Sequence, residues 1–542
     1  QDRERILQSS AEVMEELRRQ ASSSASGPGV PDLAVCESAF QQFRRSFDSR
    51  LGGFGHAPKF PRPSVLNFLL RYWKRTGNDE ALDMVATTLI AMSKGGMNDQ
   101  LGGGFHRYSV DAYWFVPHFE KMLYDQAQLA VAYLEGFQAT GNDAMESAAR
   151  QTLDYVMRDM TAPEGAFWSA EDADSASDAA QPTRKSEGFF YIWSWREAVE
   201  LLGEEHAQWF AYRYGMERLG NVQNDPHQEF TGLNILFQAH TLADVAAHFD
   251  RQASEIAAAL AEADRKLFET RAKRPRPHLD DKILTAWNGM MISAFAKAGA
   301  VLGEAKYTEA ARRAADFILQ RLRTPDGALL RRYRQGDAGI AGMLDDYAFF
   351  AQALLDLYES TFEFSYLTRA VELTGKQREL FEDRESGGFF ASAQEDAVSL
   401  MRVKDDYDGA EPSGNSIALL NLLRLHRMTG LPDYGESASK LVAAFSSRAA
   451  NAPHGLPQML CAWEYDAAEP KEIVVAGIPE KSVTRLLWRN FDPNRIVLKT
   501  SAELARYQPA VSAMTGPAVY VCRNFACNRP VSTVEDLAPL LE

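Results

Sequence analysis

The chain has 542 residues, 46% of them hydrophobic and 24% charged, which is ordinary for a globular protein. Its formal net charge of −16 argues against nucleic-acid binding, because no basic excess is available to offset the phosphates. No apolar run approaches the roughly 20 residues of a membrane-spanning helix, and four cysteines argue against a secreted disulfide scaffold. We therefore expect a cytoplasmic protein without membrane contact.

The first 31 residues differ in composition from the rest of the chain. Residues 1–20 have the pattern of a charged amphipathic helix, and residues 21–31, which read ASSSASGPGVP, have the composition of a flexible linker. Because the amphipathic pattern starts abruptly at Gln1, we expect residues 1–31 to be the tail of an upstream domain.

Between residues 32 and 468 one pattern repeats. A long loop with glycines and aromatic residues leads into an apolar helix, and a short turn such as TGND leads into an amphipathic helix. Apolar helices are expected at residues 63–75, 118–139, 194–203, 282–302, 344–359 and 413–428. Six buried helices inside six half-exposed ones make an (α/α)6 barrel, a mainly α fold whose long loops gather at one end, the mouth.

The composition changes after Glu469. Strands are predicted near Glu472–Ala476, Arg495–Lys499 and Ala518–Cys522, with a helix between the first two. We therefore expect residues 469–542 to form a small α/β domain outside the barrel.

Acidic residues recur where long loops enter the predicted inner helices. They are Glu120, Asp125, Asp172, Asp174, Asp280, Asp281, Asp345, Asp346, Asp405, Asp406, Asp408 and Glu411. Glycosyl chemistry needs one neutral and one ionised carboxyl group, roughly 5 to 10 Å apart across the sugar. The alternative is that each aspartate is a helix N-cap, although a doublet fits that role less well because its second member enters the helix.

Aromatic residues and cysteines suggest further features. Trp114, Trp168 and Trp287 are candidates for stacking on a sugar, whereas most other aromatic residues of the loops are expected to plug the wide end of the barrel. No H-x-x-x-H or Cys/His cluster predicts a metal site. Cys522 and Cys527 are expected to be reduced, and a structural or redox disulfide is the alternative.

Several long motifs resemble a known family. GGFGHAPKFP, LGGGFHRYSVDAYWFVPHFEKMLYDQAQL, HLDDKILTAWNGMM, LDDYAFF and CRNFACNRPV are similar to the spermatogenesis-associated protein 20 family, whose bacterial members are described as thioredoxin-domain-containing proteins. The resemblance implies a thioredoxin-like domain followed by a six-hairpin barrel similar to those of N-acylglucosamine 2-epimerases and six-hairpin glycosidases. No C-x-x-C precedes the helix at residues 1–20, so we expect the thioredoxin-like domain to be missing from this chain.

The resemblance also implies a role for histidines. Epimerases of this fold use paired histidines as acid and base. The histidines in the predicted mouth loops or at helix starts are His56, His106, His118, His227 and His278. The alternative is that they brace the loops through hydrogen bonds.

Together these features predict a carbohydrate-active barrel that performs glycoside hydrolysis or sugar epimerisation without a cofactor or metal. The residues expected to act in catalysis are His118, Asp281, Asp346, Glu120 and Asp125. Those expected to contact a sugar or oligosaccharide are His56, Lys59, His106, Arg107, Trp114, Trp168, Asp172, Asp174, Asp280, Trp287, Asn288, Asp345, Tyr347, Asp408 and Glu411. The alternative is a non-catalytic scaffold that binds glycan or protein and contacts a thioredoxin-like redox module.

Overall fold

The computed structural model describes residues 32–177, 183–222, 230–393, 402–523 and 526–541, together with single residues between 3 and 12. The predicted linker at 21–31, most of the predicted helix at 1–20 and His227 lie outside the described residues. The chain forms two compact units: unit 1 comprises Gln1–Arg45, Ser64–Ala81 and Leu284–Glu542, and unit 2 comprises Ser46–Pro63 and Leu82–Ile283. The predicted domain boundaries at residues 31 and 468 remain predictions.

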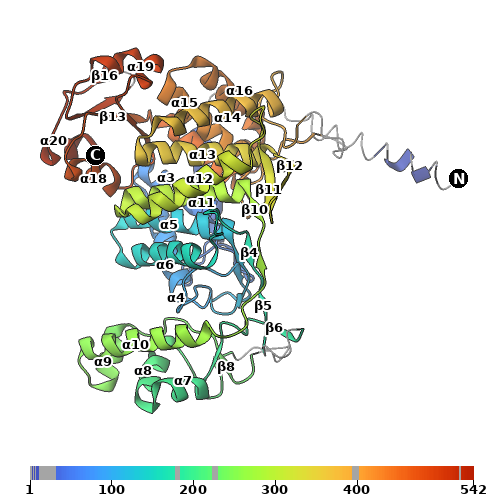
Figure 1. The fold of residues 1–542 in the computed structure, drawn as a ribbon, viewed down its shortest axis with the longest axis vertical. Coiled ribbons are helices and arrows are strands. Elements are labelled where there is room, and N and C mark those ends of the chain that lie inside the picture. The colour runs from blue at the N-terminus through green and yellow to red at the C-terminus, as the bar shows by residue number, and fades with distance from the viewer. Residues whose placement is uncertain are drawn as a thin grey trace. The chain divides into compact units, whose positions relative to one another are not determined.

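Unit 1 is built largely from helical hairpins (Figure 1). Its barrel-type helices are α2 (Leu33–Ser46), α3 (Pro63–Thr76), α11 (Thr285–Leu302), α12 (Ala305–Arg321), α13 (Leu344–Thr361), α14 (Phe364–Phe381), α15 (Gly414–Thr429), α16 (Pro432–Asn451) and α17 (Pro457–Ala467), with a 3-10 turn at Pro453–Gly455. Helix α11 packs against α12 and α13, α13 against α14 and α15, and α15 against α16 and α17. Gly303 and Gly430 end α11 and α15 with φ angles of 70° and 69°, the left-handed conformation that favours glycine at a helix C-cap.

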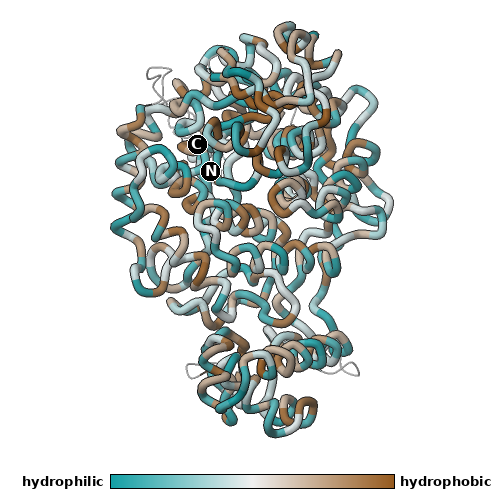
Figure 2. Tube along the Cα trace, turned by 90° about the vertical axis from the view of Figure 1, so that its left-hand side faces the viewer, coloured by the Kyte–Doolittle hydropathy of each residue, from teal (hydrophilic) through white to brown (hydrophobic). Residues whose placement is uncertain are grey.

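Burial alternates along these helices. In α11 nearly every residue from Thr285 to Ala298 is buried, whereas α12 buries one face through residues such as Tyr307, Ala311 and Ile318. Short hydrophobic and hydrophilic stretches alternate along much of the tube (Figure 2), as expected for helices with one buried face. The predicted class, a mainly α protein of the (α/α)6 type with a small C-terminal α/β part, is confirmed.

The C-terminal part of unit 1 forms the predicted sheet. Its strands are β13 (Lys471–Ala476), β14 (Arg495–Lys499), β15 (Ala518–Arg523) and β16 (Ala526–Cys527), in the order β14-β13-β15-β16. Its helices are α18 (Lys481–Arg489), α19 (Leu504–Tyr507) and α20 (Val534–Leu541), with a 3-10 turn at Pro509–Ala513. Strands β13 and β14 are parallel and are connected through α18, whereas β15 is antiparallel to β13. Residues such as Ile473, Val497, Val519 and Leu537 form its core.

Unit 2 combines helices with short strands. Its helices are α4 (Asp79–Lys94), α5 (Leu123–Thr140), α6 (Asp143–Asp159), α7 (Trp195–Leu202), α8 (Glu204–Tyr214), α9 (Leu242–Phe249) and α10 (Ala253–Arg271). Its strands are β1 (Tyr108–Ser109), β2 (Pro117–His118), β3 (Lys121–Met122), β4 (Ala170–Glu171), β5 (Asp174–Ala176), β6 (Lys185–Glu187), β7 (Trp193–Ser194), β8 (Leu233–Asn234) and β9 (Leu279–Asp280). Helix α5 packs against α6, and β3, β4 and β9 form one antiparallel sheet at the start of α5.

Three short strands complete the description. The hairpin of β11 (Leu330–Arg334) and β12 (Asp337–Ala341) follows α12 in unit 1, and β10 (Ile283–Leu284) spans the point in the sequence where unit 2 gives way to unit 1. Among the described residues, no helix has the length and apolar composition that crossing a membrane requires.

The inner helix predicted at residues 194–203 is wrong. This segment is α7, an eight-residue amphipathic helix whose fully buried residue is Ala198, and it packs with α8 and α10 around a separate small core. A helix that packs against a small core needs only one apolar face. The pattern WREAVELL therefore fits a half-exposed helix and does not indicate a helix buried on all sides. The buried helix that the sequence pattern did not predict is α17, which is buried from Pro457 to Tyr465.

The helix predicted from His118 begins instead at Leu123. Residues Pro117–His118 pair with Tyr108–Ser109, and Lys121–Met122 pair with Ala170–Glu171. These pairings between distant segments override the helix-start signal of Pro117. His118 therefore lies on a strand and does not share a helix with Asp125.

Candidate functional site

In unit 1, carboxyl groups gather where loops lead into α11, α13 and α15. Glu411 is half-buried in the loop before α15, and its Oε2 accepts a hydrogen bond of 2.8 Å from Nε1 of Trp287 on α11. Burial, followed by the negative charge of Asp345, raises the pKa of Glu411 to about 7, while Arg331 acts in the opposite direction. Glu411 can therefore hold or release a proton near neutral pH.

Asp345 lies at the start of α13 and faces the start of α15. Its carboxylate accepts a hydrogen bond from the backbone N–H of Gly414, and a Cβ atom at Gly414 would lie only 2.5 Å from its Oδ1. The glycine thus permits the close approach of the carboxylate to the positive end of α15. Burial raises the pKa of Asp345, Asp405 raises it further, and Arg331 opposes the shift.

Asp346 is completely buried and ties two helix starts together. Its Oδ1 accepts a hydrogen bond of 3.1 Å from the backbone N–H of Ala286, and its Oδ2 accepts bonds from the N–H of Met343 (2.9 Å) and from Arg331 Nη1 (3.1 Å). Burial raises its pKa to about 6. These contacts are those of the helix-capping alternative for this residue.

Asp408 has the same character. It is 4% exposed, and its carboxylate accepts hydrogen bonds from the backbone N–H groups of Ser413 (2.9 Å), Gln458 (2.7 Å) and Met459 (3.2 Å). Two of these N–H groups belong to the first turn of α17, which has Pro457 at its start. Burial raises the pKa of Asp408 to about 7 despite these bonds.

In unit 2, His118 is held between two glutamates. Its Nδ1 is 2.7 Å from Oε1 of Glu187, its Nε2 is 3.7 Å from Oε2 of Glu120, and Arg107 Nη1 donates to the same Glu120 oxygen at 2.8 Å. The interactions with the carboxylates of Glu120 and Glu187 raise the pKa of His118 to about 9. A pKa of about 9 favours the protonated imidazole at neutral pH, the form that donates hydrogen bonds from both ring nitrogens.

Because His118 is protonated between two glutamates, we expect the free energy of unfolding to depend on pH. Its pKa in the folded protein, about 9, exceeds the ordinary 6.5, so its contribution is complete below 6.5 and is lost as the pH rises through 9. In His118→Gln we expect the free energy of unfolding to fall by about 1 to 3 kcal/mol near pH 6 and by little near pH 10, as measured by urea denaturation. Exposed His56 provides the control: His56→Gln should match the wild type at both pH values. Equal losses at both pH values would contradict the predicted titration.

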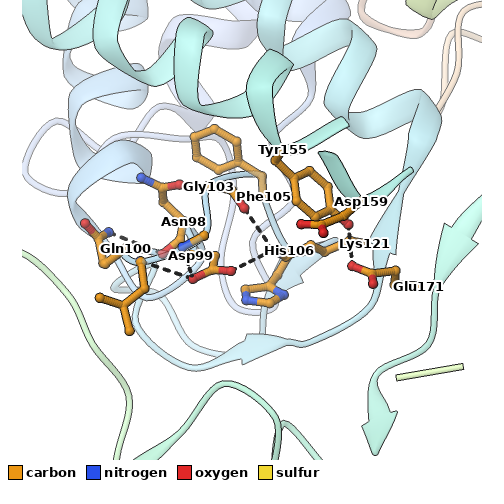
Figure 3. A network of polar contacts seen from close by, with 12 residues as sticks. Asn98, Asp99, Gln100, Gly103, Phe105, His106, Lys121, Tyr155, Asp159 and Glu171 are labelled. Carbon is orange, nitrogen blue, oxygen red and sulfur yellow. Dashed lines mark hydrogen bonds and ion pairs between the residues drawn. The ribbon is translucent and has the colours of Figure 1, made fainter. Parts of the chain in front are cut away.

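A second polar cluster of unit 2 contains Asp99, Lys121, Tyr155 and Glu171, all of which are buried. Figure 3 shows these residues and their neighbours. Asp99 accepts a hydrogen bond of 2.9 Å from Nζ of Lys121 and bonds of 2.7 and 2.9 Å from the guanidinium of Arg271 on α10. Nearby, the hydroxyl of Tyr155 donates to Glu171 at 2.6 Å. The two cations hold the pKa of Asp99 well below its usual range in spite of burial. The cluster fastens the glycine-rich loop after α4 to the rest of unit 2.

His106 lies against this cluster. It is 1% exposed, and its Nδ1 is 2.9 Å from the backbone oxygen of Phe119. Burial, reinforced by the charge of Lys121, lowers its pKa well below the usual range, so the ring is neutral. This position fits the alternative stated for these histidines, in which they brace the loops through hydrogen bonds.

The other predicted site residues have varied surroundings. Lys59 and Trp114 are buried, with Lys59 Nζ 2.7 Å from Asp48 Oδ2 and Trp114 Nε1 donating to the oxygen of Leu51 at 2.9 Å. Also buried are Asp125, Asn288 and Tyr347. Half-buried are Trp168, Asp174, Asp280 and Asp281, and exposed are His56 and Asp172.

The predicted residues are distributed over both units. Those of unit 1 are Trp287, Asn288, Asp345, Asp346, Tyr347, Asp408 and Glu411, and all the others belong to unit 2. Among the described residues, no group of three or more His, Cys, Asp or Glu side chains could hold a metal ion. Sequence reasoning missed Arg331 and Glu187, neither of which is among the candidate residues.

Comparison with known proteins gives clear relatives by sequence. Human spermatogenesis-associated protein 20 is 37% identical over 580 aligned positions, which cover 100% of this chain and 74% of the human protein. An uncharacterized protein of Caenorhabditis elegans is 34% identical over 569 positions, which cover 99% of this chain and 77% of that protein. No family model matches the chain.

Similar solved structures are more distant. Cellobiose 2-epimerase from Bacillus thermoamylovorans has a TM-score of 0.48 at 8% identity, covering 77% of this chain and 87% of that one. A D-mannose isomerase has a TM-score of 0.46 at 12% identity, covering 76% of this chain and 85% of that one.

Because the sequence match to the curated relatives extends over the whole of this chain, the chain belongs to the spermatogenesis-associated protein 20 family.

Proposed function

We propose that the protein acts on a sugar or oligosaccharide by acid–base chemistry, as a glycoside hydrolase or a sugar 2-epimerase. The proposed site lies in unit 1, at the loop-proximal ends of α11, α13 and α15. The observation that carries this proposal is the environment of Glu411: its carboxyl group accepts a hydrogen bond from Trp287, and burial together with the negative charge of Asp345 lets it hold a proton near neutral pH. Two carboxyl groups with different environments are what glycosyl chemistry requires.

The two groups would take different roles. In hydrolysis, Glu411 would give its proton to the leaving glycosidic oxygen, and ionised Asp345 would activate water or stabilise the developing positive charge on the sugar. In epimerisation, one carboxylate would take the proton from the carbon beside the carbonyl, and a protonated group would return one on the other face. Trp287, which hydrogen-bonds Glu411, would fix the orientation of the acid. Neither reaction needs a cofactor.

Unit 2, taken by itself, would offer a separate place to bind a sugar. His118, protonated between Glu120 and Glu187, would donate hydrogen bonds to hydroxyl or carbonyl oxygens. Asp281 and Asp125 of unit 2 stay sequence-based predictions, apart from the site proposed in unit 1.

The second candidate is a non-catalytic scaffold that binds glycan or protein, for example a thioredoxin-like module. The observation that favours it is the saturation of Asp346 and Asp408 by backbone N–H groups, because carboxylates used as caps are not available to a substrate. A glycan array and a turnover screen separate the two candidates.

The pH dependence of turnover tests the acid role. If Glu411 is the proton donor, kcat/KM should fall as the pH rises above about 7, approaching tenfold for each further pH unit, because only the protonated form reacts. Reducing-sugar release would identify hydrolysis, and deuterium uptake from D2O at the sugar C2 would identify epimerisation. A flat profile from about pH 5 to 9 would exclude this role, and the absence of both turnover and glycan binding would favour a scaffold for protein.

A further inference from the structure

The four cysteines, all among the described residues, fall into two classes. Cys36 and Cys461 are outside any disulfide and are 0% and 1% exposed, and burial raises the pKa of Cys36 well above its usual range. Cys522 and Cys527 are joined by a disulfide in the C-terminal sheet, where the sequence had favoured two reduced cysteines. A thiol reagent can therefore reach sulfur in the folded chain only at this pair.

The disulfide lies at the edge of the sheet. Cys522 on β15 is directly opposite Cys527 on β16, and on its other side it is opposite Glu472 of β13. Cys522 is 2% exposed, whereas Cys527 is exposed on the outermost strand. An incoming thiolate can consequently approach the sulfur of Cys527 from solvent and expel that of Cys522.

Among the described residues, three backbone hydrogen bonds outside the pairing of β15 with β16 lie on the C-terminal side of β16. The backbone N–H of Asn528 donates to the oxygen of Val521 at 2.9 Å, and Val519 and Val531 exchange bonds of 2.7 and 3.0 Å. Residues 526–530 are exposed. Beyond them, α20 is anchored separately, because Leu537 belongs to the core of the sheet. Loss of the disulfide would therefore loosen β16 without dislodging α20.

Stabilisation of the fold explains this disulfide poorly. The two cysteines are five positions apart, and a link across so short a loop removes less conformational entropy from the unfolded chain than a link across a longer loop. The hydrophobic core on which the sheet depends does not include the edge strand.

We propose that Cys522–Cys527 is a reversible thiol–disulfide exchange site, reduced in the folded protein by a dithiol, and that its reduction releases β16 from the sheet edge. This proposal is independent of the sugar chemistry. It identifies the partner only by chemical class, as a dithiol reductant.

The exchange proceeds in two balanced steps. One thiolate of the reductant bonds to the sulfur of Cys527, the Cys522–Cys527 bond breaks, and Cys522 leaves as a thiolate that takes a proton. The second thiolate of the reductant then attacks the reductant sulfur of the mixed disulfide. Cys527 leaves as a thiolate, which also takes a proton. The protein gains two electrons and two protons, and the dithiol becomes a disulfide.

Alkylation of the native full-length chain tests the exchange. The protein is treated with dithiothreitol, then with iodoacetamide, and its peptides are mapped by mass spectrometry. We expect no labelling before reduction and labelling of Cys527 and Cys522 afterwards, at a rate at least about tenfold faster than global unfolding. Cys36 and Cys461 should stay unlabelled, which reports that the chain remained folded. Labelling that requires urea, or labelling of the pair without any reductant, would overturn the proposal.

Hydrogen–deuterium exchange tests the release of β16. In the reduced protein, amides of residues 526–528 should exchange faster, while those of α20 keep their protection. The double variant Cys522→Ser, Cys527→Ser should reproduce this pattern without any reductant, and reoxidation of the wild type should reverse it. Unchanged exchange at residues 526–528 in the reduced wild type would overturn the release.

Discussion

Replacing Asp99 with asparagine is expected to lower the free energy of unfolding by about 3 to 5 kcal/mol. Asp99 is the anion shared by Lys121 and Arg271, and all three side chains are at most 4% exposed. The asparagine keeps the shape but leaves two cations in a low-dielectric interior without their counter-charge. The loss reflects two uncompensated charges and not the net value of the ion pairs.

An exposed ion pair provides the matched control. Glu262 accepts bonds from Arg265 on the surface of α10, and both side chains are about half exposed. Because solvent screens such pairs, Glu262→Gln should change the stability by no more than about 0.5 kcal/mol. Urea denaturation of both variants at neutral pH makes the comparison. If Asp99→Asn were as stable as Glu262→Gln, the cluster would not fasten the loop as we infer.

Glu411→Gln is expected to lower sugar turnover by about a hundredfold or more, the usual effect of losing a general acid. The amide oxygen of glutamine can still accept the hydrogen bond from Trp287, so the loop should keep its conformation. What is lost is the proton that Glu411 carries near neutral pH. The measurement is kcat/KM per folded molecule on whichever sugar the turnover screen identifies, with folding checked by circular dichroism.

Asp346→Asn gives the contrasting outcome. Both carboxylate oxygens of Asp346 accept hydrogen bonds from backbone N–H groups. In asparagine an amide nitrogen replaces one of these oxygens, and that nitrogen cannot accept a hydrogen bond. We therefore expect a stability loss of about 1 to 3 kcal/mol, with activity per folded molecule reduced less than in Glu411→Gln. Turnover that is unaffected in Glu411→Gln but abolished in folded Asp346→Asn would reassign the acid to Asp346.

Local patterns predicted a large part of the fold. The strands near Glu472–Ala476, Arg495–Lys499 and Ala518–Cys522 were found where their apolar runs indicated, and Gly303 and Gly430 end helices as turn residues should. The failures came where a distant segment decided the conformation. The local sequence around Pro117 indicates the start of a helix, but pairing with Tyr108–Ser109 makes Pro117 part of a strand.

The candidate site was only partly readable from the sequence. Loop-end carboxylates could be identified, and Glu411 and Asp345 were among them. A doublet such as Asp345–Asp346, however, contains two groups that the sequence cannot tell apart. The structure separates them: one is half-buried and faces Gly414, whereas the other is completely buried among backbone N–H groups.

The sequence by itself determined where many of the helices and the strands of the C-terminal sheet form, because side-chain periodicity and turn residues act over a few neighbouring positions. Only the tertiary structure decided which charges meet. Asp346 bonds to Ala286, 60 positions away, and Asp99 to Arg271, 172 positions away. The burial that raises the pKa of Glu411 and the cations that lower the pKa of Asp99 come from such distant segments, because the dielectric surroundings of a charge depend on packing in three dimensions.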